Sequence, residues 1–433
     1  MLLFAILVKA QNTFYFMEAM PQNTALNPAI IPDVKFYMGL PGIGGMNAQV
    51  HNSGFTYSQF DEFAKNLTNI GYVPDDFVNS IGETNVFRGE AELNLFSFGF
   101  RLKEKGFLSF AATMNSLLIN EAASDIAYLL TDFNDISTDD FPIIVEGISL
   151  NANTSLKVGF TYAHKINSHL TLGISPRVNF GQAGLNTSGM RYKIELINDN
   201  IEEVQFEQTF SGMAEIALPT EINPEALDQD VLNMDEGLLP ENWAEGLKAG
   251  DFLKNPGLLI DFGATYEIEK WTFSASVLNI GNPVFKNNVY KLNGKNDQVL
   301  LTETDKIKIQ VPTRFYLGAM RQFSPKWNYA LLLNNHFYST GAVTTATASL
   351  NGYIGKILST SFSYTAGYKY DNLGVGLRLR FFPGMDLYAV TDNIIQAVNF
   401  KNANWLTVAL GVNISILGHT KQPDTNELPV EIN

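Results

Sequence analysis

Strict alternation of apolar and polar residues over long runs is the main pattern in this chain. In residues 372–382 (NLGVGLRLRFF), leucine, valine and phenylalanine alternate with glycine and arginine. Segments 170–181, 258–268, 361–370 and 406–416 repeat the design. Successive side chains of a strand point to opposite faces, so each segment predicts a strand with one apolar and one polar face.

The length of these runs separates two kinds of β-protein. Strands of a soluble sandwich usually have about 5 to 6 residues, and their apolar face points inward. A strand that crosses a bilayer needs about 9 to 11 residues, with apolar side chains toward lipid and polar side chains toward a lumen. The sequence therefore predicts an all-β protein, a transmembrane antiparallel β-barrel of about 14 to 16 strands.

Charged residues lie on the polar faces of the predicted strands, where a dry core would not tolerate them. We expect seven of them to face the lumen: Lys157, Arg177, Asp261, Glu267, Arg314, Arg378 and Arg380. They could pair into a network that plugs the barrel, or line an open path that selects anions or amphiphiles. A charged content of 17% is low for a wide aqueous pore and favours the plug.

Short and long connections alternate along the chain. Tight turns are predicted at 103–106, 166–168, 269–270, 324–326, 354–355 and 383–384, and long loops at 58–83, 120–147, 219–256 and 282–306. Outer-membrane barrels place tight turns in the periplasm, which predicts periplasmic termini. Three tryptophans, Trp271, Trp327 and Trp405, follow turns at strand starts, where an interfacial aromatic belt requires them.

Two connections, 59–70 and 117–133, have apolar residues at helical spacing. This spacing predicts short amphipathic helices that cap an opening, with loop packing alone as the alternative.

The first residues predict an export signal. Residues 2–8 are apolar, and Val8-Lys9-Ala10 matches a cleavage site that would leave Gln11 as the first mature residue. A buried first strand is the alternative. The predicted organisation has four parts: a residual signal peptide at 1–10, a plug-like segment at 11–45, the barrel at 46–417 with its first strand near 46–57, and a polar tail at 418–433.

Composition excludes several functions. The 433 residues carry a net charge of −15, which argues against a nucleic-acid partner. The absence of cysteine excludes disulfides, thiolate metal sites and a cysteine nucleophile. The five histidines lack metal-ligand spacing, and the acidic loop 218–257 lacks the pattern of an EF-hand, so we expect no cofactor, no metal and no enzymatic activity.

Residues 20–29 (MPQNTALNPA), with Asn27, Pro28 and Ala29, resemble the Asn-Pro-Ala element near the start of FadL-type barrels and of PorV proteins. Segments 32–41, 371–380, 387–393 and 405–416 look like a Bacteroidota family of outer-membrane proteins. The resemblance implies a monomeric barrel of about fourteen strands. It also implies an amino-terminal segment tucked into or under the lumen.

Two functions follow from this resemblance. PorV-like relatives are accessory subunits that bind other envelope proteins, whereas FadL relatives pass hydrophobic molecules through a lateral opening. We expect a non-enzymatic outer-membrane accessory or scaffold subunit of a secretion or assembly complex, with a FadL-like conduit as the first alternative and a secreted all-β adhesin as the second. Outer-membrane lipid, other envelope proteins and a hydrophobic ligand are the expected partners. A closed wall with a packed lumen would argue against transport, and a kinked strand that opens sideways would argue for it.

Overall fold

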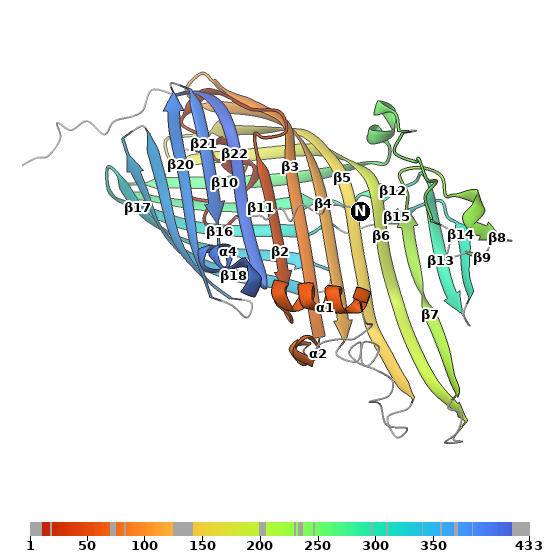
Figure 1. Ribbon diagram of the computed structural model, residues 1–433. Helices are drawn as coiled ribbons and strands as arrows, with labels where there is room; N and C mark the ends of the chain where they lie inside the picture. Colours follow the sequence, from red (N-terminus) through yellow and green to blue (C-terminus); the bar gives the residue numbers. More distant parts are fainter. Residues whose placement is uncertain are drawn as a thin grey trace, which may run out of the picture.

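The computed structural model of the chain is built almost entirely from β-strands (Figure 1). It describes all residues except 1–10, 18–19, 70–74, 82–83, 124–141, 199–204, 229–230, 233–236, 246, 296–297, 309–310, 340, 356, 368–370, 383 and 418–433. In the part of the chain that it describes, no helix is long and apolar enough to cross a membrane.

The wall of a closed barrel contains β1 (Val34–Gly39), β2 (Met46–Asn52), β3 (Thr84–Leu102), β4 (Gly106–Ala123), β5 (Ile143–Lys165), β6 (Leu170–Asn198), β10 (Pro256–Ile268), β11 (Trp271–Ile280), β16 (Thr313–Ser324), β17 (Trp327–Tyr338), β18 (Gly341–Ile354), β19 (Leu358–Ala366), β20 (Asn372–Phe382), β21 (Met385–Thr391) and β22 (Trp405–Leu417). Neighbouring strands are antiparallel, and β22 closes the ring by pairing with both β1 and β2. Strands β1 and β2 both lie between β22 and β3, so together they occupy one place in the ring, and the wall has fourteen strand positions. The predicted fold class and strand number are confirmed.

The alternating pattern places side chains as the sequence predicts. On β17, Leu331 is 62% exposed on the outside, while its near neighbour Asn334 is 5% exposed and points inward. Apolar outer positions recur around the ring, for example at Phe262, Leu317 and Leu377. A wall that is apolar outside and polar inside suits lipid on one side and water or polar protein on the other.

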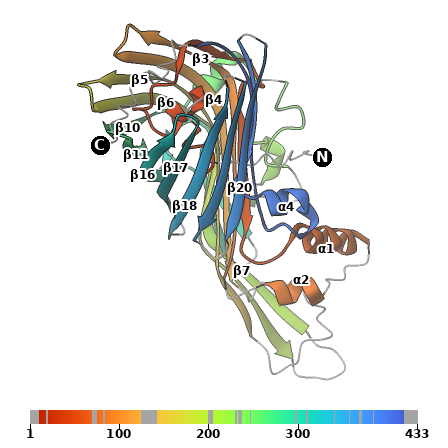
Figure 2. The ribbon, with the colours of Figure 1, turned by 90° about the vertical axis from the view of Figure 1, so that its left-hand side faces the viewer.

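Tight turns and long loops lie at opposite ends of the barrel. The predicted turns join β3 to β4, β5 to β6, β10 to β11, β16 to β17 and β18 to β19 at one end, which we call the tight-turn end. The first wall strand begins there at Val34, and the last ends there at Leu417. The opposite, long-loop end carries α1 (Tyr57–Asn69), α2 (Asp75–Ser80), α4 (Ile394–Val398) and the 3₁₀-turn η6 (Phe400–Asn402) (Figures 1 and 2).

Two sequence-based boundaries need correction. Helix α1 confirms the helix predicted at 59–70, but residues 117–123 are the end of β4, and the remainder of the predicted helix lies outside the described residues. These residues form a strand because residues 117–121 pair with β3 on one side and with β5 on the other. The wall begins at Val34, within the range assigned to the plug-like segment. The sequence did not predict this strand because β1 is too short to show the alternation.

A sheet projects from one side of the barrel. Strands β5 and β6 run on beyond the wall and continue into β7 (Gln205–Ala217), toward the lower right of Figure 1. The projecting sheet also contains β13 (Val289–Lys295), β14 (Gln298–Glu303), β8 (Leu227–Asp228) and β9 (Val231–Leu232). Two short strands, β12 (Val284–Phe285) and β15 (Ile307–Lys308), pair separately, and η4 (Pro224–Ala226) and η5 (Ala249–Leu253) lie in the acidic loop.

Candidate functional site

Residues 11–33 fill part of the lumen, and we call them the plug. Its apolar side chains form one buried cluster with apolar side chains of the wall. The cluster contains Phe14, Tyr15, Phe16, Met17, Met20 and Leu26 of the plug and Tyr316, Met320, Leu332, Tyr388 and Val390 of the wall. The Tyr15 and Tyr316 rings stack with centroids 5.5 Å apart. Burying this apolar surface holds the plug inside a lumen that is otherwise polar.

Glycines on the inner wall make room for the plug. A β-carbon on Gly318 would meet the Phe16 ring at 2.7 Å, and one on Gly376 would meet the Met17 sulfur at 2.5 Å. Gly173 and Gly263 face Pro28 and Asn27 still more closely. The strand glycines therefore form a cradle whose shape matches the plug, since any larger side chain would overlap it.

The Asn-Pro-Ala element sits at this cradle. Asn27 is fully buried, its Oδ1 accepts the N–H of Ala29 at 2.9 Å, and its Nδ2 donates to the Tyr15 hydroxyl at 3.1 Å. Tyr15 in turn donates to Ser274 Oγ at 3.2 Å. The element thus fixes the turn by which the plug leaves the lumen and connects to β1.

One position of the wall is broken. Residues 40–45 interrupt it between β1 and β2, and among the described residues the ladder joining β2 to β3 has one pair, Asn52↔Phe87. The ladder joining β2 to β22 has six pairs. Gly44 permits the bend, because a β-carbon there would lie 2.6 Å from the Gly39 carbonyl carbon.

The plug forms hydrogen bonds with this break. Gln22, in η1 (Pro21–Ala25), donates from Nε2 to the Gly44 carbonyl at 3.0 Å and to Asn413 Oδ1 of β22 at 2.6 Å. At the far side of the break, the Asn94 N–H donates to the Gly45 carbonyl at 2.7 Å. A single plug side chain therefore joins the break to the last strand of the wall.

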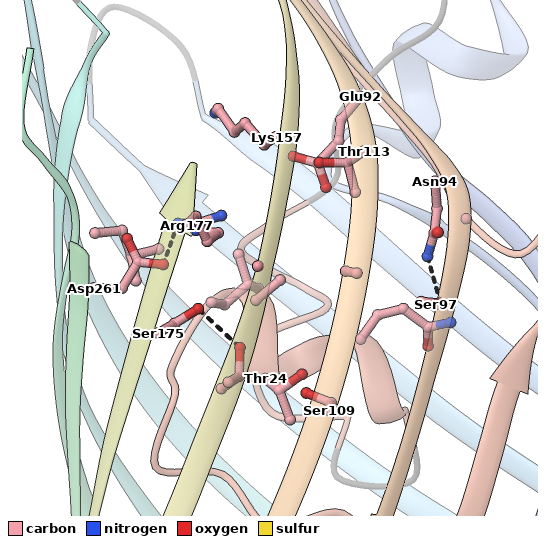
Figure 3. A pocket seen from close by; sticks show the side chains of 18 of the residues that line it. Thr24, Glu92, Asn94, Ser97, Ser109, Thr113, Lys157, Ser175, Arg177 and Asp261 are labelled. Carbon is pink, nitrogen blue, oxygen red and sulfur yellow. Dashed lines mark hydrogen bonds and ion pairs between the residues drawn. The ribbon is translucent and has the colours of Figure 1, made fainter. Parts of the chain in front are cut away.

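A polar cavity of about 90 Å³ lies in the lumen between the break and strands β4 to β10 (Figure 3). Arg177 forms a salt bridge with Asp261, and Asn94 donates to Ser97 Oγ at 2.7 Å. Lys157, which contacts Asn115 at 3.4 Å, and Glu92 also line the cavity. Four residues predicted to face the lumen line this cavity together: Lys157, Arg177, Asp261 and Arg314.

A chain of polar contacts crosses the lumen near the long-loop end. Arg314 of β16 forms a salt bridge with Glu90 of β3, and Tyr338 of β17 donates to the same carboxylate at 2.7 Å. His336 connects the Tyr338 hydroxyl, 3.1 Å away, to the Tyr316 hydroxyl, 3.2 Å away. The predicted lumen residue Arg314 thus bridges non-adjacent strands and narrows the lumen.

The other predicted lumen charges lie toward the tight-turn end. Arg378 and Arg380 both donate to Asp386, at 2.6 and 2.7 Å, and Arg380 also donates to Ser415 Oγ at 2.6 Å. Glu267 is exposed and lines a cavity of about 1010 Å³ that opens at this end beside Phe16 and Ile30. Arg378, Arg380 and Glu267 therefore lie apart from the charged residues that line the lumen cavity.

The tryptophans divide into two groups. Trp271 and Trp327 lie on the outer face at the tight-turn end, and the Arg321 guanidinium lies 5.4 Å from the Trp271 ring centroid. Trp405 is 5% exposed on the inner face, where its ring meets His51 edge-on at 5.4 Å. The interfacial role predicted for Trp405 is therefore wrong, because the alternation of β22 turns position 405 inward.

A pocket of about 240 Å³ lies where the acidic loop folds against the long-loop ends of the wall strands. Apolar side chains dominate it, from Met114, Leu218, Trp243, Leu247 and Phe252. Gln182 fixes the loop by donating to the Phe252 carbonyl at 2.9 Å. We call it the entrance pocket. The sequence identified the loop by its charge but missed this apolar lining.

Other important residues escaped the sequence analysis. Gln22 and Asp386 each bind a partner that is distant in sequence or lies on another strand. Their only signal is a polar residue on a predicted inner face. Within the described residues, no cluster of three or more histidine or acidic side chains could hold a metal ion.

The family described as a family of unknown function (DUF5723) matches the chain over residues 28–310 and 296–392. These ranges cover more than half of the chain. Among curated proteins, none matches it.

Several solved structures are weakly similar to the chain. The Ralstonia pickettii toluene transporter TbuX has a TM-score of 0.46 and 9% identity, over 96% of this chain and 100% of that one. A Pseudomonas aeruginosa FadL homologue has a TM-score of 0.45 and 10% identity, over 95% and 99%. The Pseudomonas putida toluene transporter TodX has a TM-score of 0.42 and 11% identity, over 94% and 96%. At these values the likeness assigns no function to the chain.

Proposed function

Because the chain belongs to the DUF5723 family, whose function is unknown, its own geometry has to indicate its role, and we propose that it is a bacterial outer-membrane conduit for hydrophobic small molecules. In this proposal a signal peptide at 1–10 is removed on export, the tight-turn end with both termini faces the periplasm, and the protein is not an enzyme. Hydrophobic solutes are the class of ligand because they can leave a barrel sideways into lipid.

The break between β1 and β2 is the observation that carries the proposal. A closed barrel satisfies its backbone groups through its ladders, so β2, which has one ladder pair with β3, is the least bonded part of the position that it shares with β1. The break adjoins the lumen cavity, whose lining includes Gly45 and Asn94. Opening β2 from β3 would therefore connect the lumen to the bilayer while the β2–β22 ladder stays in place.

The entrance pocket offers a binding site for such a solute on the outer side of the wall. It is apolar and lies at the long-loop end. Because Met114 in its lining and Thr113 of the lumen cavity are successive residues of β4, the pocket and the cavity lie on opposite faces of that strand. Drug-sized ligands bind in pockets lined mainly by apolar and aromatic side chains. The plug blocks a straight passage to the tight-turn end, so we infer that the break is the path by which a solute crosses between the lumen and the outer side of the wall.

A reversible crosslink tests the route. A β-carbon at Gly45 would lie 3.5 Å from Asn94 Cβ, which is the spacing that a disulfide needs, and the chain has no native cysteine. We expect oxidised Gly45→Cys/Asn94→Cys to lose uptake of a fluorescent fatty acid by at least tenfold, with recovery after reduction.

The matched control crosslinks a wall position away from the break. Thr347 and Thr365 are paired on β18 and β19 with hydroxyls 2.8 Å apart, so Thr347→Cys/Thr365→Cys adds the same bond to an intact ladder. Uptake that survives oxidation of Gly45→Cys/Asn94→Cys, with the crosslink verified, would overturn the proposal. Equal losses in both variants would also overturn the specific role of the break.

The projecting sheet favours a second candidate function, that of a PorV-like accessory subunit. Strands β7, β13 and β14 lie outside the barrel, where they contribute nothing to the wall. A sheet of this kind offers strand edges to another envelope protein. Purification of the natively expressed protein in gentle detergent distinguishes the candidates: stoichiometric envelope proteins support the subunit, and a lone barrel that carries lipid or fatty acid supports the conduit.

A further inference from the structure

The first described residues of the chain converge on one buried carboxylate. The Asn12 and Thr13 N–H groups donate to Asp392 at 3.1 and 2.7 Å, and the Gln11 N–H binds the same side chain. Asp392 follows β21 and is 3% exposed. Three consecutive backbone donors on one carboxylate form the kind of nest that usually holds an anion.

The charge of Asp392 lacks a cationic side chain among the described residues, where no lysine, arginine or histidine forms a salt bridge with it. The other buried carboxylates behave differently: Glu90, Asp261 and Asp386 each pair with an arginine. A buried carboxylate held by hydrogen bonds without a cation is costly, and a nearby cation would offset much of that cost.

The segment that donates to Asp392 is itself fixed to the wall. The Tyr15 N–H donates to the Gln11 carbonyl at 3.1 Å, which makes residues 11–15 a first helical turn. Three side-chain contacts hold this turn: Tyr316 donates to Gln11 Oε1 at 2.5 Å, Asn334 donates to Asn12, and Thr13 lies 2.7 Å from Ser363 Oγ. Each of the first three residues is therefore bound by its own partner in the wall.

We propose that processing between Ala10 and Gln11 creates an α-ammonium group that binds Asp392 inside the lumen. Hydrolysis of that peptide bond leaves a carboxylate on Ala10 and an amino group on Gln11, which is protonated at neutral pH. The new cation lies at the position of the Gln11 N–H and supplies Asp392 with a positive charge that no described side chain provides. Removal of the leader and seating of the plug are then one linked event.

The test uses the full-length protein exported in cells and purified from the outer membrane. We expect an intact mass and an amino-terminal sequence that begin at Gln11. In the folded protein, labelling of the α-amino group by an aldehyde selective for amino termini should be at least tenfold slower than after denaturation. Asp392→Asn should remove most of this protection and expose Phe14 and Tyr15 to chymotrypsin.

The matched control is Asp371→Asn, which changes an exposed carboxylate that binds Tyr364 and does not touch the plug. It should leave labelling as slow as in the unchanged protein. A mature chain that starts elsewhere, a Gln11 cyclised to pyroglutamate, or an α-amino group labelled as fast in the folded as in the denatured protein would each overturn the proposal. Should Asp392→Asn fail to assemble, the mass and the labelling of the unchanged protein still decide it.

Discussion

Gln22 and Asn413 exchange two hydrogen bonds between the plug and the last wall strand: Gln22 Nε2 donates to Asn413 Oδ1 at 2.6 Å, and Asn413 Nδ2 donates to Gln22 Oε1 at 3.2 Å. The same Gln22 nitrogen also binds the Gly44 carbonyl in the wall break. The plug and the break are thereby coupled, because the plug cannot move away without releasing both partners.

Removal of this link should loosen the break. Gln22→Ala deletes hydrogen bonds that contribute about 1 kcal/mol each. We expect faster uptake of a fluorescent fatty acid, by about threefold to tenfold, and a lower unfolding temperature. Gln322→Ala, at an exposed position of β16, is the control and should change neither quantity. Unchanged uptake in a Gln22→Ala barrel of normal yield would contradict the coupling.

Filling the glycine cradle should displace the plug. In Gly263→Ala the new methyl group would overlap Asn27 and approach Pro28 Cδ to 3.0 Å. Overpacking of this kind costs about 1–3 kcal/mol. We expect faster chymotrypsin cleavage within residues 11–33, measured by mass spectrometry of the digest. Gly250→Ala has open space around the added methyl group and should digest at the original rate.

The pair that crosses the lumen should matter more as a pair than through either member. Arg314→Met leaves Glu90 buried without its arginine, which should lower the free energy of unfolding by about 3–5 kcal/mol. The double variant Arg314→Met/Glu90→Gln should recover part of this loss in urea unfolding monitored by circular dichroism. Asp61→Asn breaks the exposed Lys65–Asp61 pair and should change the midpoint little. Equal midpoints for the single and double variants would contradict the expected coupling.

The entrance pocket should bind ligand mainly through the Trp243 ring. Trp243→Ala removes the largest apolar group from the lining. We expect about tenfold weaker binding of a fluorescent fatty acid in fluorescence titration, which corresponds to about 1.4 kcal/mol. Phe337→Ala, on the outer face of β17, removes an aromatic ring of similar size and should leave the affinity unchanged. Equal weakening in both variants would indicate nonspecific partition into the detergent layer.

The sequence was sufficient wherever a single strand determines the outcome. Position 331 faces outward and position 334 faces the lumen because a pleat alternates with a period of two, and that information is local. The tight turns could be predicted for the same reason, because each turn lies where an alternating run of residues ends.

Contacts between distant segments could not be predicted. Residues 117–123 have apolar positions that also fit a helix, and only pairing with β3 and β5 makes them a strand. Arg314 could be placed in the lumen, but its partner Glu90 lies 224 positions away and across the barrel. Trp405 follows a turn as an interfacial residue would, yet the register with β2 and β21 turns it inward.

The wall closes where its last strand meets its first, at the pairs of β22 with β1 and β2. The plug is joined directly to β1, lies within the ring and binds Asn413 of β22. The ring is complete around the plug only when β22 has paired with β1 and β2, and the hydrogen bonds between Gln22 and Asn413 form at that same seam. Closure of the wall and seating of the plug therefore depend on the same strand.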